Sequence, residues 1–420
     1  MKIPLSKLPP PRDLAHGLYL GGEEFVALLE SGQGFVERSR YTLVAWGVER
    51  EYVAHGGELY NVLDSAYRGL ARGEGPFGGE VAIGVVAYDA AAYVEPVLLK
   101  YGKVRRPVAF FVKPRGFVLY DKALGRAYVY GEVPPIRGVG DGGELEVRGP
   151  VGQTDSASFK RWVAEAKRRI EAGEAFQVVL SRFVDFAARG DLFKLYQSLA
   201  ELNPSPYMYF LKWRDVAVLG TSPELLVKVQ GDRAETHPIA GTRPRGATEE
   251  EDIALEEEML RDEKELAEHS MLVDLARNDL GRVCRPGTVR VDELFAVEKY
   301  SRVQHIVSRV SCVVEKKYSP VDVLLAAHPA GTVSGAPKVR AMEIIAELEE
   351  EPRWIYAGAL GFFSPALSEF AIVIRSAVFH EGLLRIQAGA GVVYDSTPER
   401  EFNETEAKLK ALREALGLWT

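Results

Sequence analysis

The segment Pro238-Ile-Ala-Gly-Thr-Arg-Pro-Arg-Gly246 lies in the middle of the pattern from which the fold of this chain is predicted. Before it, residues 207–212 and 216–220 are rich in aromatic and β-branched side chains and predict strands. After it, residues 370–379 and 383–393 predict strands in the same way. Helical patterns lie between the strands without a regular strand–helix–strand rhythm, and no GxGxxG motif follows a first strand. The chain therefore predicts an α+β protein with large antiparallel sheets.

The composition of the 420-residue chain excludes several classes of partner. The formal net charge is −8 and no long basic run is present, so nucleic acid is not an expected partner. No apolar stretch is long enough for a membrane span, and the first residues lack the apolar core of a secretory signal. We therefore expect a cytoplasmic protein with no membrane partner. The abundance of Glu, Lys and Arg over Asn and Gln also indicates a thermophile.

The glycine-rich residues 137–144 predict a linker or long loop. They divide an N-terminal region, residues 1–150, from a C-terminal region, residues 151–420. Helical patterns are predicted at the following segments: 23–30, 158–172, 192–202, and 253–280 as one helix or two. A last helix begins near Ser396, where Ser396-Thr-Pro-Glu399 matches a capping box.

Two pairs of glutamates are candidate metal ligands. Glu265 with Glu268, and Glu401 with Glu404, are each three residues apart and share one face if both segments are helical. Two facing pairs would form an oxygen-rich site suited to Mg²⁺. The alternative is a solvated helix face, which is the commoner role of charged residues at this spacing.

Two glycine-dense segments would let backbone amides approach an anion, although by themselves they are better explained as tight turns or closely packed strands. They are Pro329-Ala-Gly-Thr-Val-Ser-Gly-Ala-Pro337 and Gln387-Ala-Gly-Ala-Gly-Val-Val393. Neither is followed by the GK[ST] triplet of a P-loop. The seven histidines include no zinc-binding HExxH pattern, and His305 alone is more easily explained as a structural or surface histidine.

Together, however, the motifs resemble the ordered signature set of the chorismate-utilising enzymes, most closely the large subunits of anthranilate synthase. The similarity extends from about Phe159 to Leu416 and rests on the segment quoted first and on four further motifs: Asp274-Leu-Ala-Arg-Asn-Asp-Leu-Gly281, Ala330-Gly-Thr-Val-Ser-Gly-Ala-Pro-Lys338, Ile374-Arg-Ser376 and Gln387-Ala-Gly-Ala-Gly391. The resemblance implies two large antiparallel sheets packed as a sandwich with helices outside. It also implies a lyase that converts chorismate and ammonia to anthranilate and pyruvate, the first step of tryptophan biosynthesis.

The resemblance implies a role for each matching position. Glu268 and Glu404 would bind Mg²⁺, supported by Glu265 and Glu401, and the metal would hold the ring carboxylate of chorismate. Glu224 would protonate the departing C4 hydroxyl, and His305 would act as acid or base at ring C2. Thr332 would be a further catalytic residue that lines the substrate. Arg375 would bind the enolpyruvyl carboxylate. The remaining substrate-lining positions would be Gly241, Thr242, Tyr356, Gly389, Ala390 and Gly391.

Two positions bear on the choice of nucleophile within the family. Relatives that make isochorismate or salicylate carry a lysine where this chain has Gln177, and that lysine activates water. Aminodeoxychorismate synthases commonly carry a nucleophilic lysine where this chain has Ala240. With both lysines absent, ammonia is expected to add directly at C2. An aminodeoxychorismate synthase remains the alternative, because some of these enzymes lack the lysine.

The N-terminal region resembles the feedback segment of anthranilate synthase, which implies L-tryptophan as an inhibitor. Its pocket would lie between Ser31 and the segment Pro206-Tyr207-Met208. A tryptophan-binding regulator with a dead catalytic site is a further, non-enzymatic alternative. Neither Cys284 nor Cys312 has the context of a glutaminase nucleophile, so the expected ammonia source is a separate glutamine amidotransferase subunit, as in a heterotetramer.

Overall fold

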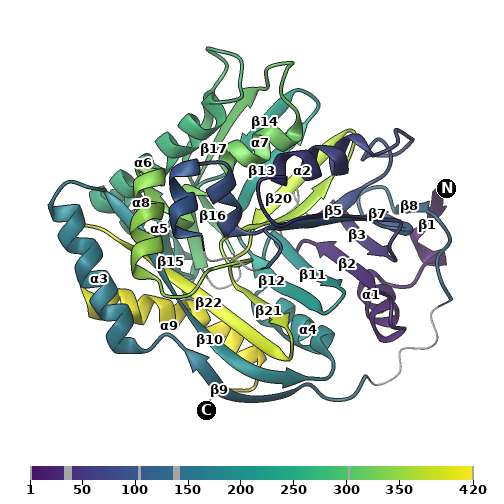
Figure 1. The fold of residues 1–420 in the computed structure, drawn as a ribbon, viewed down its shortest axis with the longest axis horizontal. Helices are drawn as coiled ribbons and strands as arrows, with labels where there is room; N and C mark the ends of the chain where they lie inside the picture. Colours follow the sequence, from purple (N-terminus) through teal and green to yellow (C-terminus); the bar gives the residue numbers. More distant parts are fainter. Residues whose placement is uncertain (1, 33–39, 103–105, 136–141, 301–302, 419–420) are drawn as a thin grey trace.

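The computed structural model describes residues 2–32, 40–102, 106–135, 142–300 and 303–418 of the chain. These residues form two antiparallel sheets that pack face to face, with helices against their outer faces (Figure 1). The predicted α+β sandwich with outer helices is therefore confirmed. No helix within these ranges is long and apolar enough to cross a membrane.

Both sheets combine strands from distant parts of the chain. The larger, twelve-stranded sheet runs in the order β1 (Lys2–Pro4), β8 (Arg126–Tyr130), β7 (Gly116–Asp121), β3 (Tyr41–Trp46), β2 (Phe25–Glu30), β11 (Tyr207–Trp213), β12 (Val216–Ser222), β21 (Ser376–His380), β22 (Leu383–Val392), β10 (Gln177–Arg189) and β18 (Gly335–Ala336), with β9 (Glu146–Gln153) also paired to β10. The ten-stranded sheet runs in the order β15 (Ile239–Pro244), β17 (Val303–Val313), β14 (Arg233–Thr236), β13 (Leu225–Gln230), β20 (Leu367–Ile372), β19 (Ala359–Phe363), β5 (Ala82–Val86), β6 (Ala109–Lys113) and β4 (Arg50–Ala54), with β16 (Arg290–Lys299) also paired to β17.

Helices cover the outer faces of both sheets and one end of the sandwich (Figure 1). The α-helices are α1 (Pro11–Leu20), α2 (Leu59–Arg68), α3 (Ser156–Glu171), α4 (Leu192–Leu202), α5 (Glu249–Arg261), α6 (Glu263–Gly281), α7 (Pro320–Ala327), α8 (Lys338–Leu348) and α9 (Pro398–Ala415). Short 3₁₀ turns are η1 (Leu5–Lys7), η2 (Tyr88–Tyr93), η3 (Pro96–Tyr101) and η4 (Gly331–Val333).

The side chains of β2 show how the layers are held together. Phe25 and Ala27 face the second sheet and join the core between the sheets. Val26 and Leu28 point the other way, into a core shared with α1 and α4. Alternate residues of a strand point to opposite faces, so a strand buried on both faces must be apolar throughout. For this reason β2 has no polar alternation in its sequence.

The same strand corrects one local prediction. Residues 23–30 were expected to be helical, but residues 25–30 form β2, because burial on both faces outweighs the helix propensity of Ala, Leu and Glu. The strand predicted at residues 370–379 is in fact two strands, β20 and β21, separated at Arg375. The last helix is capped by Thr397 rather than Ser396. The predicted linker at 137–144 lies largely outside the described residues.

The N-terminal strands complete both sheets. Strand β2 pairs with β11, and β5 pairs with β19, so each sheet contains strands from both sides of residue 150. The division into residues 1–150 and 151–420 stays a prediction about the sequence, and the two parts share a core between the sheets.

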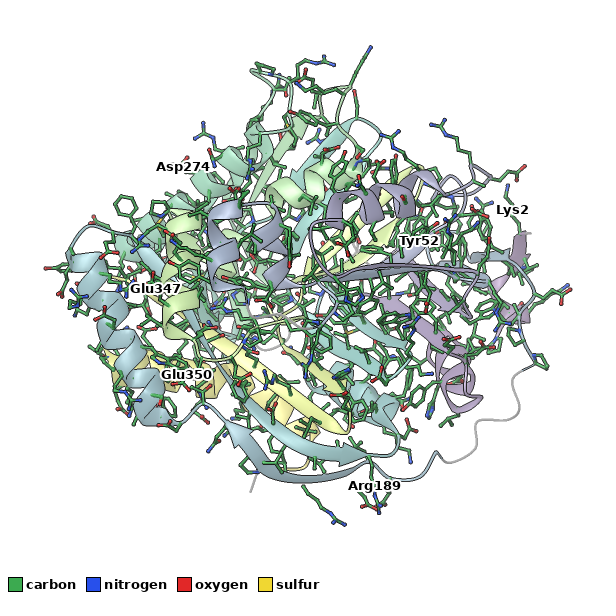
Figure 2. The ribbon with its side chains drawn as sticks, in the orientation of Figure 1. Lys2, Tyr52, Arg189, Asp274, Glu347 and Glu350 are labelled. Carbon is green, nitrogen blue, oxygen red and sulfur yellow. A yellow bond between two sulfur atoms is a disulfide. The ribbon has the colours of Figure 1, made fainter. Side chains whose placement is uncertain are left out.

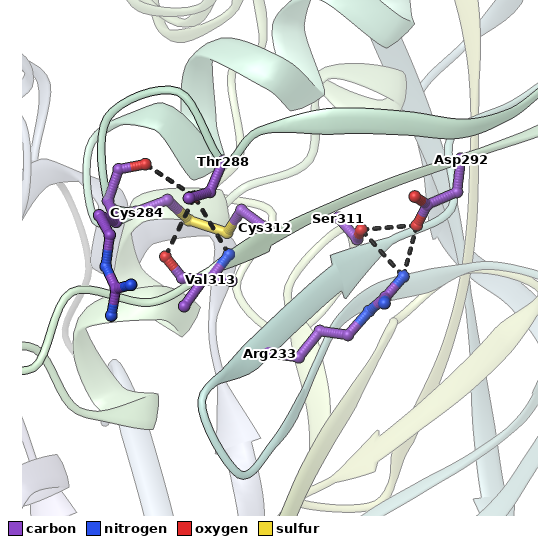
Figure 3. Close-up of a disulfide and its surroundings, with 8 residues drawn as sticks. Arg233, Cys284, Thr288, Asp292, Ser311, Cys312 and Val313 are labelled. Carbon is purple, nitrogen blue, oxygen red and sulfur yellow. Dashed lines mark hydrogen bonds and ion pairs between the residues drawn. A yellow bond between two sulfur atoms is a disulfide. The ribbon is translucent and has the colours of Figure 1, made fainter.

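The two cysteines form a disulfide that the sequence analysis did not predict. Cys284 lies just after α6, Cys312 lies in β17, and the bond closes a loop of 28 residues (Figure 3). Next to it, the Thr288 hydroxyl accepts a hydrogen bond from the Val313 amide at 3.2 Å. The disulfide therefore ties α6 to β17. Disulfides are rare in reducing compartments, with hyperthermophiles as the known exception.

We predict that Cys284→Ser lowers the free energy of unfolding by about 3–4 kcal/mol, because a loop of this length is no longer closed in the unfolded chain. Chemical denaturation of the variant and of the disulfide-bonded parent chain, both without reductant, measures this difference. A reductant should produce the same loss in the parent chain and no further loss in Cys284→Ser. Equal unfolding midpoints for the variant and the oxidised parent would contradict the prediction.

Candidate active site

The predicted catalytic and substrate residues come from different elements that converge on the side of the molecule opposite the N-terminus, around α6, α9, β15 and β22 (Figure 1). The turns before β13 and β19, the break between β20 and β21, and the 3₁₀ turn η4 supply the other predicted side chains.

Glu224 lies in the turn between β12 and β13 and is buried. Its backbone is fixed on both sides, because its amide donates to Ser222 Oγ at 3.3 Å and its carbonyl accepts from the Ile372 amide at 3.1 Å. Burial raises the pKa of Glu224 to about 8, although the nearby Thr332 hydroxyl and the Ile239 amide favour the ionised form. At neutral pH this carboxyl group is mostly protonated and can donate a proton.

His305 has the opposite perturbation. It lies buried on β17, opposite Thr242 of β15, where the ladder is interrupted by a bulge at Gly241. Gly241 has a φ of +67°, which glycine adopts without strain, and its carbonyl lies 3.0 Å from His305 Nδ1. Burial is the largest cause that lowers the pKa of His305 to about 4. A proton on Nδ1 that is donated to this carbonyl leaves Nε2 as a base.

Arg375 lies at the break between β20 and β21 with a φ of +52°. An arginine in this left-handed region is strained, and such residues cluster at functional sites. Its guanidinium makes no hydrogen bond or ion pair with the described residues. Burial lowers the pKa of Arg375, and the charges of Tyr356 and Glu404 only partly offset this effect. An unpaired guanidinium in a partly buried position is suited to bind a carboxylate from a ligand.

The glycines of β22 bring the backbone close to neighbouring side chains. A Cβ atom at Gly389 would lie 3.0 Å from the Tyr356 hydroxyl, and one at Gly391 would lie 2.8 Å from the amide nitrogen of Gln177. A side chain at Gly389 would crowd the Tyr356 hydroxyl and the Leu180 carbonyl, and one at Gly391 would displace the Gln177 side chain. Ala390 points to the other face of the strand, so it can offer only its backbone to a ligand on the face of Gly389 and Gly391.

The four predicted glutamates are near one another, on α6 and α9. Burial raises the pKa of Glu268, and the negative charges of Glu265, Glu401 and Glu404 raise it further. Burial also raises the pKa of Glu401. Within the described ranges, no three His, Cys, Asp or Glu side chains are close enough to form a metal-binding group. The carboxylates are thus coupled electrostatically without being a complete set of ligands.

Two cations in this region were missed by the sequence analysis. Lys408 donates to Glu404 at 2.6 Å and to the Gly389 carbonyl at 2.8 Å, and its charge influences both Glu224 and His305. Arg243 lies 3.1 Å from Glu265 and holds that carboxylate. Lys408 is four residues after Glu404, the helical spacing that could have identified it.

Two of the signature motifs have a structural role. Lys338 donates to Asp279 at 2.6 Å, and both residues are largely buried, so the motif ending in Lys338 is joined to the motif of residues 274–281. The motif of residues 274–281 also has an outward end, because the Asp274 side chain is 71% exposed at the periphery of the molecule (Figure 2). Part of the family signature therefore fixes α8 against α6 rather than contacting a ligand.

The four residues predicted to bind tryptophan line one pocket of about 410 Å³ between the two sheets: Ser31, Pro206, Tyr207 and Met208. The volume is in the range of small-molecule sites. The opposite wall includes Arg309 of β17 and Leu225 of β13. These strands also lead to the catalytic site, since β17 carries His305 and Glu224 directly precedes β13.

Comparison with known proteins agrees with this geometry. Residues 24–414 match the family of chorismate binding enzymes. The chain is 48% identical to anthranilate synthase component 1 of Aeropyrum pernix, over 99% of this chain and 95% of that protein. It is also 48% identical to the component 1 of Saccharolobus solfataricus, over 93% of each chain. A crystal structure of anthranilate synthase component I from Streptococcus pneumoniae superposes with a TM-score of 0.77 at 32% identity, covering 89% of this chain and 92% of that chain. With a family match over nearly its whole length and relatives at this identity, the chain belongs to the chorismate binding enzymes.

Proposed function

We propose that the chain is the large component of an anthranilate synthase, which converts chorismate and ammonia to anthranilate, pyruvate and water in tryptophan biosynthesis. The observation that carries this proposal is the pairing of a protonated acid, Glu224, with a neutral base, His305, beside the unpaired Arg375. The relatives named anthranilate synthase component 1 support the same reaction.

Each residue has one task in this scheme. Arg375 binds the enolpyruvyl carboxylate, and the backbone of β22 from Gly389 to Gly391 supports the substrate. Glu224 gives its proton to the C4 hydroxyl, which leaves as water while ammonia adds at C2. The added nitrogen loses a proton, which returns Glu224 to its acid form. His305 then takes the C2 proton as the bond from C3 to the ether oxygen breaks. The departing enolpyruvate takes up a proton and becomes pyruvate, and the ring becomes aromatic. The opposed pKa values of Glu224 and His305 hold both groups in the required protonation state near pH 7.

The nitrogen nucleophile follows from two side chains. Gln177 lies beside Gly391, where relatives that add water carry a lysine, and an amide cannot act as a base. Ala240 of β15 offers no nucleophile of its own. These residues support direct addition of ammonia over addition of water or of an enzyme amine.

The glutamates of α6 and α9 fit a Mg²⁺ ion. Burial raises the pKa values of Glu268 and Glu401, and the charge of Glu404 raises both further, so a divalent cation bound there would favour the ionised carboxylates. Glu268 and Glu404 would hold the ion, with Glu265 and Glu401 supporting them, and substrate and water would complete its coordination, as is usual for Mg²⁺. When bound, Mg²⁺ would neutralise the ring carboxylate of chorismate.

The proposal includes a partner and an inhibitor. The designation component 1 in the relatives supports a second component, which we infer to be a glutamine amidotransferase that supplies ammonia in the cytoplasm. L-Tryptophan is proposed to bind the pocket between the sheets. There it would contact strands that continue to Glu224 and His305, so its binding can alter their positions.

The reaction is tested by incubating the purified chain with chorismate, MgCl₂ and ammonium chloride and identifying the products. We expect fluorescent anthranilate and an equal amount of pyruvate. Accumulation of 4-amino-4-deoxychorismate without pyruvate would identify the alternative reaction. The absence of any turnover would instead favour a tryptophan-binding regulator.

We predict that Glu404→Ala lowers Mg²⁺-dependent activity by at least about tenfold, because one ligand carboxylate is lost. Initial rates over a MgCl₂ titration measure the effect, and circular dichroism verifies folding. Glu399→Ala in the same helix is the matched control, since Glu399 is exposed and pairs only with Lys160 among the described residues. Wild-type rates and magnesium response in Glu404→Ala would refute the assignment.

We predict that Ser31→Ala weakens inhibition by tryptophan about fivefold, the effect of losing one hydrogen bond of about 1 kcal/mol. Inhibition curves at fixed chorismate measure it, and uninhibited activity should not change. Ser65→Ala on the exposed surface of α2 is the control. Identical inhibition curves for Ser31→Ala and the parent would count against this pocket.

A further inference from the structure

A second, much smaller cavity is lined in part by Tyr356, one of the predicted substrate residues. Its volume is about 40 Å³, and its walls include Tyr356, Ser376, Val378, Arg385 and Gln387. One water molecule needs a cavity of about 10–15 Å³, so this cavity can take molecules of the size of water or ammonia. It is too small for chorismate or an amino acid.

The cavity lies along one face of β22, on which the predicted substrate residue Gly389 also lies. Arg385, Gln387 and Gly389 lie on one face of β22, because alternate residues of a strand share a face. At the outer end, Arg385 forms two hydrogen bonds of 2.8 Å with Asp185 of β10. At the inner end, the hydroxyl of Tyr356, another wall residue, lies over Gly389. A small molecule in this cavity is therefore next to the substrate site.

Gln387 gives the cavity a hydrogen-bond acceptor. The residue is 94% buried, and its amide nitrogen donates to Ser181 Oγ at 2.8 Å. Ser181 Oγ in turn donates to Glu349 at 3.0 Å, which fixes the orientation of the Gln387 amide. The Gln387 carbonyl oxygen has no hydrogen-bond partner among the residues that the structure describes. A buried acceptor without a partner is costly unless a ligand or water provides a donor.

The charges of the wall select against cations. The cavity is lined by three arginines, Arg106, Arg353 and Arg385, and by the carboxylate of Asp185. Arg353 and Arg385 each have a carboxylate partner, Glu349 and Asp185, whereas Arg106 lies 4.6 Å from the ring centre of Trp354 and pairs with no carboxylate in the described part of the chain. Guanidinium groups beside a narrow passage repel ammonium and leave neutral ammonia, the nucleophilic form, free to enter.

We propose that this cavity is the binding site and last passage for ammonia, which donates a hydrogen bond to Gln387 Oε1 before it reaches the substrate. The inference rests on the proposed function and adds to it the site that holds the second substrate. It makes Gln387 a positioning residue, whose loss should affect the use of ammonia and spare the binding of chorismate.

The test uses Gln387→Met, which keeps the length of the side chain and removes the acceptor. Steady-state rates are measured with ammonium chloride and chorismate varied in turn at fixed pH. We expect the KM for ammonia to rise about three- to tenfold, the loss of one hydrogen bond, while the KM for chorismate stays within twofold. Gln153→Met on the exposed side of the neighbouring strand β9 is the control and should leave both constants unchanged.

Two results would overturn the inference: an unchanged KM for ammonia, or an equal rise of both KM values. If Gln387→Met does not fold, Val378→Ile adds one methylene to the cavity wall and should raise the KM for ammonia in the same selective way. An active parent chain with unaffected variants refutes the ammonia site alone. A parent chain that makes no anthranilate from chorismate and ammonium refutes the proposed function itself.

Discussion

The pairing of β10 with β22 is the interaction on which the rest of the site depends. Ten consecutive residues of each strand pair, from Val178 with Val392 to Ala187 with Leu383, although the strands are about two hundred residues apart in the chain. This ladder places Gln177 and Ser181 beside the glycines and Gln387 of β22. Because the side-chain period of a strand is two, a slip of one residue would turn these groups away from the substrate.

The site uses one physical means to obtain two opposite protonation states. Burial disfavours charge, so it raises the pKa of Glu224 and lowers that of His305, and both groups are neutral near pH 7. The negative charge that remains lies on the glutamates of α6 and α9, at the edge of the site. The burial of the acid and the base therefore depends on the same packed sandwich that holds the strands together.

The sequence predicted the sandwich, and its motifs named candidate site residues without giving their geometry. The motifs identified Glu224, His305 and Arg375, but not the left-handed backbone that separates β20 from β21 at Arg375, because that conformation is imposed by tertiary packing. Residues 23–30 were assigned to a helix because a strand buried on both faces lacks alternation. Lys408 was missed because a lysine four residues from a glutamate is common on exposed helices.

The shared sheets also limit how the chain can be shortened. A fragment that begins at residue 151 would leave β11 without β2 and β19 without β5, so two central strands would become unprotected edges. Such edges are templates for pairing with other chains, and the inner faces of both sheets would be uncovered as well. The segment from residue 151 onward is thus expected to aggregate when expressed alone, and the two parts of the chain must be inherited and engineered as one folding unit.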